Sequence, residues 1–294
     1  MRKIAAAFIL VVLVLAAGCA GSRQAQPEEN LQSDFQKIMD RKASPREMID
    51  FSNHNLSRLP RDSATRLVLR LESTQREQLE ARTSALLDAD TQIALQRFGY
   101  NSSLEDMIKS TNDQKLRSVL QETRANGFKL IPLEGNYYPI IDYERYQIYQ
   151  PYINEDIKTY IDIAAAESNQ AYLNDAALTI TWPELARRAL RAESFIGQYT
   201  NSARIDDVRQ QYDIYVTTYL YGANNTPAFD YDTKTLSEKA RQSYYEVARS
   251  SADKSQIVEV IRRYLPILEK NKYQRTPEVE QYLKNAQKSL LSAE

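Results

Sequence analysis

The sequence has little of the side chains on which many catalytic and metal sites depend. It contains one histidine, His54, and one cysteine, Cys19, in 294 residues. The sequence therefore offers almost no residues for a histidine-dependent triad or for a zinc site with several histidines. A single cysteine also cannot form an intrachain disulfide. His54 falls in the last turn of an expected helix, where an imidazole interacts favourably with the helix dipole. We therefore expect a structural role for it.

Phosphate-binding motifs are absent as well. The sequence has no glycine-rich phosphate loop and no dinucleotide fingerprint, so it gives no basis for nucleotide chemistry, and we expect no cofactor. Charge is close to balance, with 38 Lys and Arg against 39 Asp and Glu. This balance indicates neither a nucleic-acid partner nor a polybasic membrane surface.

Glycine is scarce. Beyond residue 30 the glycines are Gly99, Gly127, Gly135, Gly197 and Gly222. An all-β chain of this size needs many more glycines for its turns, so the scarcity favours helices. Several of these glycines follow apolar-periodic stretches and are interpreted as helix stops.

Helix start signals agree with this fold class. Three runs match the capping box, in which a hydroxyl and a Glu satisfy free backbone donors: SPRE from Ser44, TWPE from Thr181 and TLSE from Thr235. Pro277 after Thr276 marks a further start. Apolar residues recur at helical spacing within residues 157–164, 205–219 and 257–268. We predict a mainly α, multi-helical bundle.

The composition changes near residue 127. Before it, a helical pattern runs from Ala64 to about Phe98, as one helix or as two with a break near residues 88–90. After it, residues 128–141, FKLIPLEGNYYPII, place two apolar runs and two prolines around EGN, which predicts one small, edge-like β-hairpin. We therefore expect a charged helical subdomain at 31–127 and a tyrosine-rich helical subdomain at 128–294.

The N-terminus has the pattern of an export signal. Arg2 and Lys3 precede an uncharged, mostly apolar run that ends at Gly18 and is short for a membrane span. The run LAAGC, which ends at Cys19, resembles the lipobox of bacterial lipoproteins. The resemblance implies that residues 1–18 are removed and that Cys19 is acylated; an ordinary secretory signal is the alternative.

Acylation with more than one chain gives stable membrane anchoring. Residues 19–30 are small and polar and suit a lipidated tether. We therefore expect a protein held on the cell membrane by a lipid on Cys19, facing outside the cytoplasm. The chain also resembles a group of uncharacterised tyrosine-rich lipoproteins of Gram-positive bacteria, on the runs EGNYYPIIDY, EDIKTYIDIAAAES and YGANNTPAFDYDTKT. This resemblance implies no particular activity.

Tyrosine is the abundant aromatic residue, with 20 Tyr against 7 Phe and 1 Trp. Tyrosines at helical spacing are interpreted as core. Those in residues 136–152 are interrupted by Pro139 and Pro151, so we expect some of these rings to reach the surface, where tyrosines and carboxylates suit sugars or peptides. The ligand-binding candidates are Tyr137, Tyr138, Tyr143, Tyr146 and Tyr149, with Asn224 and Asn225 from the polar loop at 221–231.

Two Glu-Ser pairs are the strongest catalytic candidates. Glu167 and Glu193 each precede a serine on an expected helix, superficially similar to the Glu-Ser of lytic transglycosylases. Such a role needs one Glu with a raised pKa as general acid. The Gly-Leu-Met-Gln and Ala-Tyr-Asn motifs of that family are absent, so the pattern favours a solvated Glu on a helix face.

A calcium loop is also excluded by the residue types. Counted from Asp230, an EF-hand would need Gly at position 235 and Glu at position 241, and the sequence has Thr235 and Arg241. We expect no metal site. The sequence therefore predicts a non-enzymatic binding or structural protein of the cell envelope, whose partner is cell-wall glycan, a peptide or another envelope protein. The alternative is a carboxylate-dependent enzyme that cleaves cell-wall glycan.

Overall fold

The computed structural model describes residues 28–99, 102–250 and 254–291, and Cys19 lies outside them. The described chain is mainly helical, and its sheets are pairs of antiparallel strands. The predicted mainly α fold with a small hairpin at 128–141 is therefore confirmed, and two further pairs of two-residue strands accompany it. No described helix is both long enough and apolar enough to cross a membrane.

The first part of the chain surrounds one long helix, α3. Its elements are α1 (Glu28–Asp40), α2 (Pro45–Asn55), the 3₁₀ turn η1 (Leu56–Arg58), α3 (Arg61–Leu86), α4 (Ala89–Leu95), α5 (Leu104–Ser110), α6 (Gln114–Ala125), β1 (Phe128–Leu133) and β2 (Asn136–Ile141). The long helical pattern resolves into two helices. Asp88 leaves the helical backbone, and its carboxylate accepts from the Thr91 N–H to begin α4.

The prolines of the hairpin lie where they remove no hydrogen bond between its strands. The backbone N–H and C=O of Tyr137 both bond to the side chain of Gln92 on α4, so they point away from β1. Such outward pairs recur at every second residue of an antiparallel ladder. Pro132 is paired with Tyr137 and Pro139 with Leu130, so both prolines occupy outward positions, in accord with the edge-like hairpin that the sequence predicts.

The rest of the chain continues as helices joined by short strands. Its elements are the 3₁₀ helix η2 (Tyr143–Tyr152), α7 (Glu155–Asn169), β3 (Leu173–Asn174), β4 (Ala177–Leu178), α8 (Trp182–Gln198), α9 (Ile205–Tyr221), β5 (Gly222–Ala223), β6 (Thr226–Pro227), α10 (Glu238–Ala248), α11 (Gln256–Lys270) and α12 (Pro277–Leu291).

Local signals locate most of the helix starts and miss two details. Ser44 and Thr181 are N-caps as predicted, and α12 begins at Pro277. The predicted start at Thr235 is wrong, because Ser237 is the N-cap of α10 while Thr235 forms a β-bridge to Gln274. Gly197 lies inside α8 and is not a helix stop.

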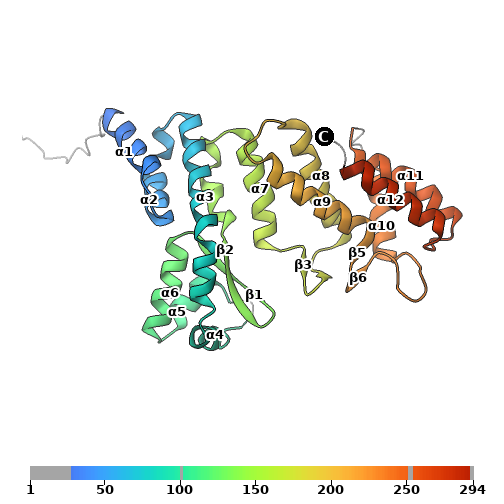
Figure 1. Ribbon diagram of the computed structural model, residues 1–294, viewed down its shortest axis with the longest axis horizontal. Helices are drawn as coiled ribbons and strands as arrows, with labels where there is room; N and C mark the ends of the chain where they lie inside the picture. The colour runs from blue at the N-terminus through green and yellow to red at the C-terminus, as the bar shows by residue number, and fades with distance from the viewer. Residues whose placement is uncertain (1–27, 100–101, 251–253, 292–294) are drawn as a thin grey trace, which may run out of the picture.

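The helices form an elongated molecule (Figure 1). The helices α1 and α2 lie at one end, α4 to α6 and the hairpin at the lower end of α3, and α10 to α12 at the opposite end. The larger core includes buried residues from Leu31 to Leu290 and so draws on both sides of residue 127. A smaller core joins Tyr137 to α4, α5 and α6. The subdomain boundary at residue 127 stays a prediction.

Tyrosine rings build much of the core in the C-terminal helices. Tyr219, Tyr244 and Tyr264 are buried, and together with Tyr282 they form consecutive ring contacts. The ring centroids are 5.1 Å apart between Tyr219 and Tyr244 and 5.8 Å apart between Tyr244 and Tyr264, within the range of favourable aromatic pairs. These tyrosines on helices are core residues, as their spacing predicts.

Candidate ligand-binding cleft

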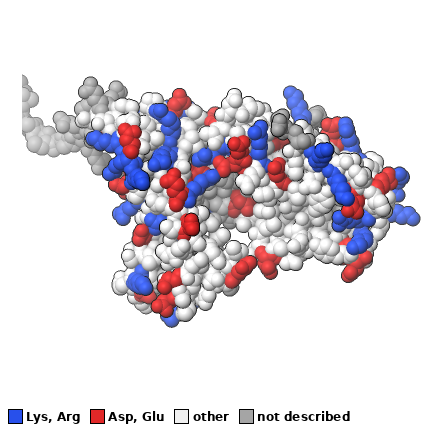
Figure 2. Space-filling view, viewed as in Figure 1, with Lys and Arg blue, Asp and Glu red and all other residues white. Residues whose placement is uncertain are grey.

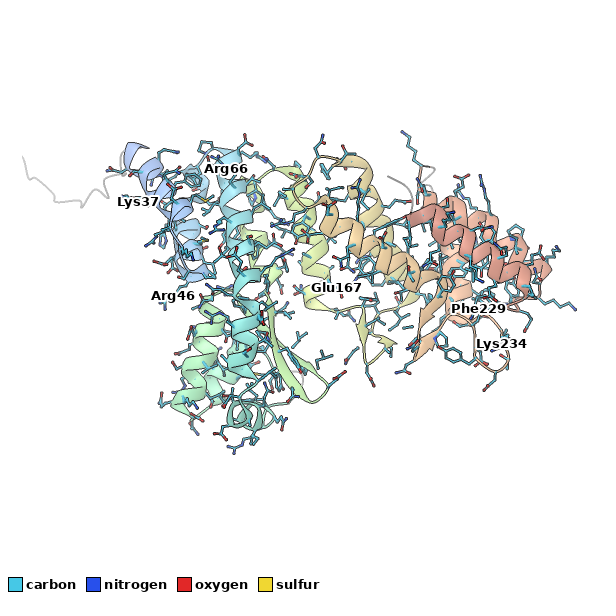
Figure 3. All side chains as sticks on the ribbon, in the orientation of Figure 1. Lys37, Arg46, Arg66, Glu167, Phe229 and Lys234 are labelled. Carbon is cyan, nitrogen blue, oxygen red and sulfur yellow. The ribbon has the colours of Figure 1, made fainter. Side chains whose placement is uncertain are left out.

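A cleft of about 560 Å³ lies between α3, the β1–β2 hairpin, α7 and α9. Figure 2 shows the surface hollowed between the part that contains the hairpin and the part that contains α8 to α10. In Figure 3, Glu167 lies towards the end of α7, beside this hollow. The volume falls in the range of about 300–1,000 Å³ that is typical of small-molecule sites.

Each element contributes the side chains of one of its faces to the cleft wall, at helical spacing on α7 and α9 and at alternate positions on the hairpin strands. Ala164, Ser168 and Ala171 follow each other at spacings of four and three on and after α7, and Asp207, Gln211 and Ile214 do the same on α9. On the hairpin, side chains alternate between faces. The half-buried face carries two isoleucines into the cleft, Ile131 from β1 and Ile140 from β2.

The hairpin is tied to the end of α7. Nζ of Lys129 donates to Oδ1 of Asn169 at 2.6 Å and lies 3.4 Å from Oδ1 of Asp142. Asn169 is the last residue of α7, whereas Lys129 is the second residue of β1. This contact fixes the separation of two walls of the cleft at one end.

A buried carboxylate organises the floor of the cleft. Glu72, in the middle of α3, is 3% exposed and accepts hydrogen bonds from the hydroxyls of Tyr143 and Tyr160. Its oxygens also lie 2.8 Å from Nη2 of Arg76 and 2.7 Å from Nη2 of Arg204. Four donors satisfy the charge, which is the condition for burying a carboxylate at tolerable cost.

Burial keeps the two tyrosines of the floor protonated. Desolvation raises the pKa of Tyr143, and the neighbouring Glu72 carboxylate raises it further. Desolvation likewise raises the pKa of Tyr160 well above its usual range, with Tyr143 and Glu72 adding to the effect. Both hydroxyls therefore remain hydrogen-bond donors to Glu72 near neutral pH.

The ionic groups that reach the cleft are paired. Nη1 of Arg76 lies 2.8 Å from Oδ1 of Asp207, and Nε of Arg204 lies 3.6 Å from Oδ2 of the same residue. The amides of Gln210 and Gln211 also line the cleft and make no hydrogen bond within the described parts of the chain. The lining of the cleft therefore combines aliphatic side chains with charged groups that are already paired and with amides that are free.

Glu167 lines the cleft, but its carboxylate is already bound on both oxygens. Oε2 accepts from Nη1 of Arg188 at 2.9 Å and from the Tyr215 hydroxyl at 2.7 Å, and Oε1 accepts from the Tyr172 N–H at 2.9 Å. In each of these contacts Glu167 is the acceptor. A general acid must instead hold a proton directed at its substrate.

Glu193 lies away from the cleft and caps a helix. Its carboxylate accepts from the Ser255 hydroxyl and, at 3.1 Å, from the Ile257 N–H, both at the start of α11. These contacts satisfy backbone and side-chain donors at a helix N-terminus. The structure therefore brings Glu167 to the cleft and gives Glu193 a structural contact.

The predicted tyrosines divide between the core and the cleft. Tyr137, Tyr146 and Tyr149 are buried, and their hydroxyls bond to the Phe98 and Gly99 carbonyls, to Gln75 and to Asn53, respectively. Tyr143 lines the floor of the cleft. Tyr138 is paired with Ile131 and so shares the hairpin face that borders the cleft.

The predicted asparagines lie in an exposed turn between β5 and β6. The backbone N–H of Asn225 donates to the Ala176 carbonyl at 2.8 Å, and its side chain donates to the Asp175 carbonyl at 2.6 Å. These bonds hold the turn against the β3–β4 turn. Asn224 is exposed beside it, and neither asparagine lines the cleft.

The Asp230 loop forms a local turn. The Asp230 carboxylate accepts from the backbone N–H groups of Asp232 and Thr233 and from the Thr233 hydroxyl. These bonds, with the Thr233 backbone first, lower the pKa of Asp230. Among the residues that the structure describes, no group of three or more His, Cys, Asp and Glu could hold a metal ion.

Sequence reasoning missed Glu72, Arg76, Asp207 and Gln211. One local signal was available, because Glu72 follows Val68 by four residues and Leu71 by one and so falls next to the apolar stripe of α3. A charged residue beside such a stripe requires a partner.

Comparison with known proteins identifies no relative of this chain: no family model, no curated protein and no solved structure matches it.

Proposed function

We propose that this chain is a lipid-anchored extracytoplasmic binding protein whose ligand occupies the cleft between α3, the hairpin, α7 and α9. The observation that carries the proposal is the composition of this cleft. Aliphatic side chains from four elements surround a floor whose charges are paired, and the amides of Gln210 and Gln211 are left free. A mostly apolar cavity with a few placed polar groups is typical of small-molecule sites.

The Glu72 cluster supports this proposal because it fixes the walls before a ligand arrives. Glu72 and Arg76 belong to α3, Tyr160 to α7, and Arg204 immediately precedes α9. Their mutual bonds therefore join three of the four elements that form the cleft. A preformed site loses less conformational freedom on binding than a flexible one.

The binding claim can be tested by thermal unfolding of the protein starting at Ser22, which retains both hydrophobic cores. It is heated alone and with a peptidoglycan digest, oligosaccharides, peptides and neutral apolar compounds. A ligand at about 100 times its dissociation constant stabilises the fold by about 2.7 kcal/mol. We expect at least one addition to raise the melting temperature by a few degrees.

Two alanine variants locate the effect. Ala164 is half-buried and lines the cleft, so Ala164→Phe fills part of it. Ala81 is exposed on α3, so Ala81→Phe is the matched control. The thermal shift should vanish in Ala164→Phe and persist in Ala81→Phe. A shift of equal size in both variants would place the ligand elsewhere and contradict the proposal.

Anchoring is tested separately. Replacing Cys19 by Ala removes the thiol that the lipobox motif assigns to acylation, and we expect this variant to leave the membrane fraction. The wild-type chain should incorporate labelled fatty acid and sediment with membranes. A Cys19→Ala chain that stays on the membrane without lipid label would contradict the proposed anchor.

The glycan-cleaving alternative requires Glu167 to act as an acid although it accepts from Arg188, Tyr215 and Tyr172. Incubation of purified peptidoglycan with wild type and Glu167→Gln tests it. Release of soluble glycan by the wild type and its loss in the variant would favour the enzyme over a protein that only binds.

A further inference from the structure

The cleft offers no free countercharge to a ligand. Of the carboxylates at or below its surface, Glu72 is bound by Arg76 and Arg204, and Asp207 by the same two arginines. Glu167 is bound by Arg188 at 2.9 Å. A charged ligand group would have to break one of these pairs or enter the cleft unpaired, and both are costly.

The polar groups that remain free are neutral. The side chains of Gln210 and Gln211 each present a carbonyl acceptor and an NH₂ donor, and neither is bonded to another described residue. An amide or a hydroxyl of a ligand complements such groups, because each can both donate and accept. Gln211 is the better placed of the two, since it is half-buried whereas Gln210 is exposed.

The walls are aliphatic. The side chains that line them include Leu79, Ile131, Ile140, Ile163, Val208 and Ile214. The two aromatic residues of the floor, Tyr143 and Tyr160, have their hydroxyls bound to Glu72. Alkyl chains bury well against such walls, whereas the hydroxyl-rich edge of a sugar would lose its hydrogen bonds to water without replacement.

We infer that the cleft selects an uncharged, mainly aliphatic small molecule that carries an amide or hydroxyl group, with Gln211 as the residue that recognises this group. The inference rests on the proposed binding function. It names a ligand class that the sequence motifs do not assign. It also gives the paired charges of the cleft a role, because they leave no opposite charge free to bind a charged analogue.

The test uses N-phenyl-1-naphthylamine, a neutral probe that fluoresces in apolar surroundings, with the protein that starts at Ser22. Three competitors share one alkyl chain and differ in the head group: decanamide, decanoate and decylamine. At about pH 7 the last two are ionised. We expect decanamide to displace the probe at a concentration about tenfold below that of either charged competitor. The amide can bond to Gln211, whereas a carboxylate or an ammonium group would enter the cleft without an opposite charge to pair with.

Variants separate this inference from the proposed function. Gln211→Leu should weaken displacement by decanamide while the probe still binds, and Gln281→Leu, an exposed glutamine on α12, should change neither. Ala164→Phe should reduce probe binding, with Ala81→Phe as its control. If Ala164→Phe fails to fold, Ser168→Phe blocks the same wall from the next turn of α7.

The outcomes are distinct. A probe that does not bind, or that binds Ala164→Phe and Ser168→Phe as well as wild type, overturns the ligand class, and the thermal shifts of wild type, Ala164→Phe and Ala81→Phe with the other ligands then decide the proposed function. A probe that binds in the cleft but is displaced equally by decanoate or decylamine overturns the ligand class and leaves the binding function intact. Unchanged decanamide affinity in Gln211→Leu overturns the role given to Gln211.

Discussion

Nη2 of Arg204 lies 2.7 Å from Oε2 of Glu72, and this pair joins the residue before α9 to the middle of α3. Arg204 is 16% exposed, and without Glu72 its guanidinium would be left with the longer contact of 3.6 Å to Oδ2 of Asp207. We predict that Glu72→Ala lowers the free energy of unfolding by about 3–5 kcal/mol, the cost of leaving a buried charge without its partner. Urea denaturation followed by circular dichroism measures it.

Glu77 provides the matched control on the same helix. Its carboxylate is 63% exposed and lies 3.8 Å from Arg70. An exposed pair of this kind contributes about 0–1 kcal/mol, so Glu77→Ala should be close to wild type. Equal losses in the two variants would show that the Glu72 cluster does not organise the junction of α3 and α9.

Gln92 covers the outer edge of the hairpin through both backbone groups of Tyr137. Its amide donates to the Tyr137 carbonyl at 2.9 Å and accepts from the Tyr137 N–H at 2.8 Å. Gln92→Ala leaves these buried groups unsatisfied, so we predict a loss of about 1–3 kcal/mol. Hydrogen exchange at the Tyr137 amide should also accelerate.

Gln96 is the control for this prediction. It lies one turn further along and donates to the Gly135 carbonyl at an exposed position, where water replaces a lost bond. Gln96→Ala should therefore leave both stability and exchange at Tyr137 nearly unchanged. An unchanged exchange rate in Gln92→Ala would contradict the proposed protection of the edge.

The parts of the fold that could be predicted depend on short stretches of sequence. Ser44 and Glu47 form a capping box within four positions, and the hairpin is recognisable from apolar runs around a turn. The sequence predicts the start of α10 two residues too early, because Thr235 has the same local pattern but forms a β-bridge with Gln274. That contact links distant residues and has no local signature.

The candidate site was much less predictable. Sequence reasoning selected tyrosines from one segment, of which Tyr143 reaches the floor of the cleft and Tyr146 and Tyr149 pack in the core. The cleft itself is assembled from α3, the hairpin, α7 and α9. Periodicity shows which side of a helix is apolar, but not which other helix it meets. The pairing of Glu72 with Arg204 is therefore invisible in the sequence.

Gly197 lies inside α8, where alanine should be the better residue. Apart from its chain neighbours and the backbone of α8 itself, a Cβ at this position would have no heavy atom within 4 Å. Because glycine loses more backbone freedom than alanine on forming a helix, we predict that Gly197→Ala raises the free energy of unfolding by about 0.5–1 kcal/mol. A loss of stability in denaturation experiments would contradict this prediction.

Gly222 ends α9 and should respond in the opposite direction. Its φ is +80°, and a Cβ would overlap the backbone of Thr226, Pro227 and Ala228. Gly222→Ala therefore combines a strained conformation with a clash that no side-chain rotation relieves, and we predict a loss of more than about 1 kcal/mol. Comparing its unfolding with that of Gly197→Ala separates this local effect from a general response to alanine.

Tyr149 makes the fold sensitive to alkali. Burial raises its pKa to about 12 from the ordinary value of 10. Above about pH 10 the unfolded chain releases this proton while the folded chain retains it, so the stabilisation is complete below pH 10 and is lost as the pH rises to about 12. The difference between the folded and unfolded pKa values corresponds to a contribution of at most about 2.7 kcal/mol from this residue.

Urea denaturation at several pH values between about 8 and 12 measures this loss, with tyrosinate absorbance recorded in parallel. Tyr149→Phe has no ionisable hydroxyl at this position, so its stability should fall less steeply with pH than that of the wild type, although it also loses the bond to Oδ1 of Asn53. Loss of that bond lowers the stability of the variant at every pH. Only the slope of stability against pH therefore tests whether Tyr149 carries the alkaline response. Parallel slopes for the two proteins would show that Tyr149 does not carry the alkaline response, and would assign it to the other buried tyrosines, whose pKa values burial also raises, such as Tyr146 and Tyr244.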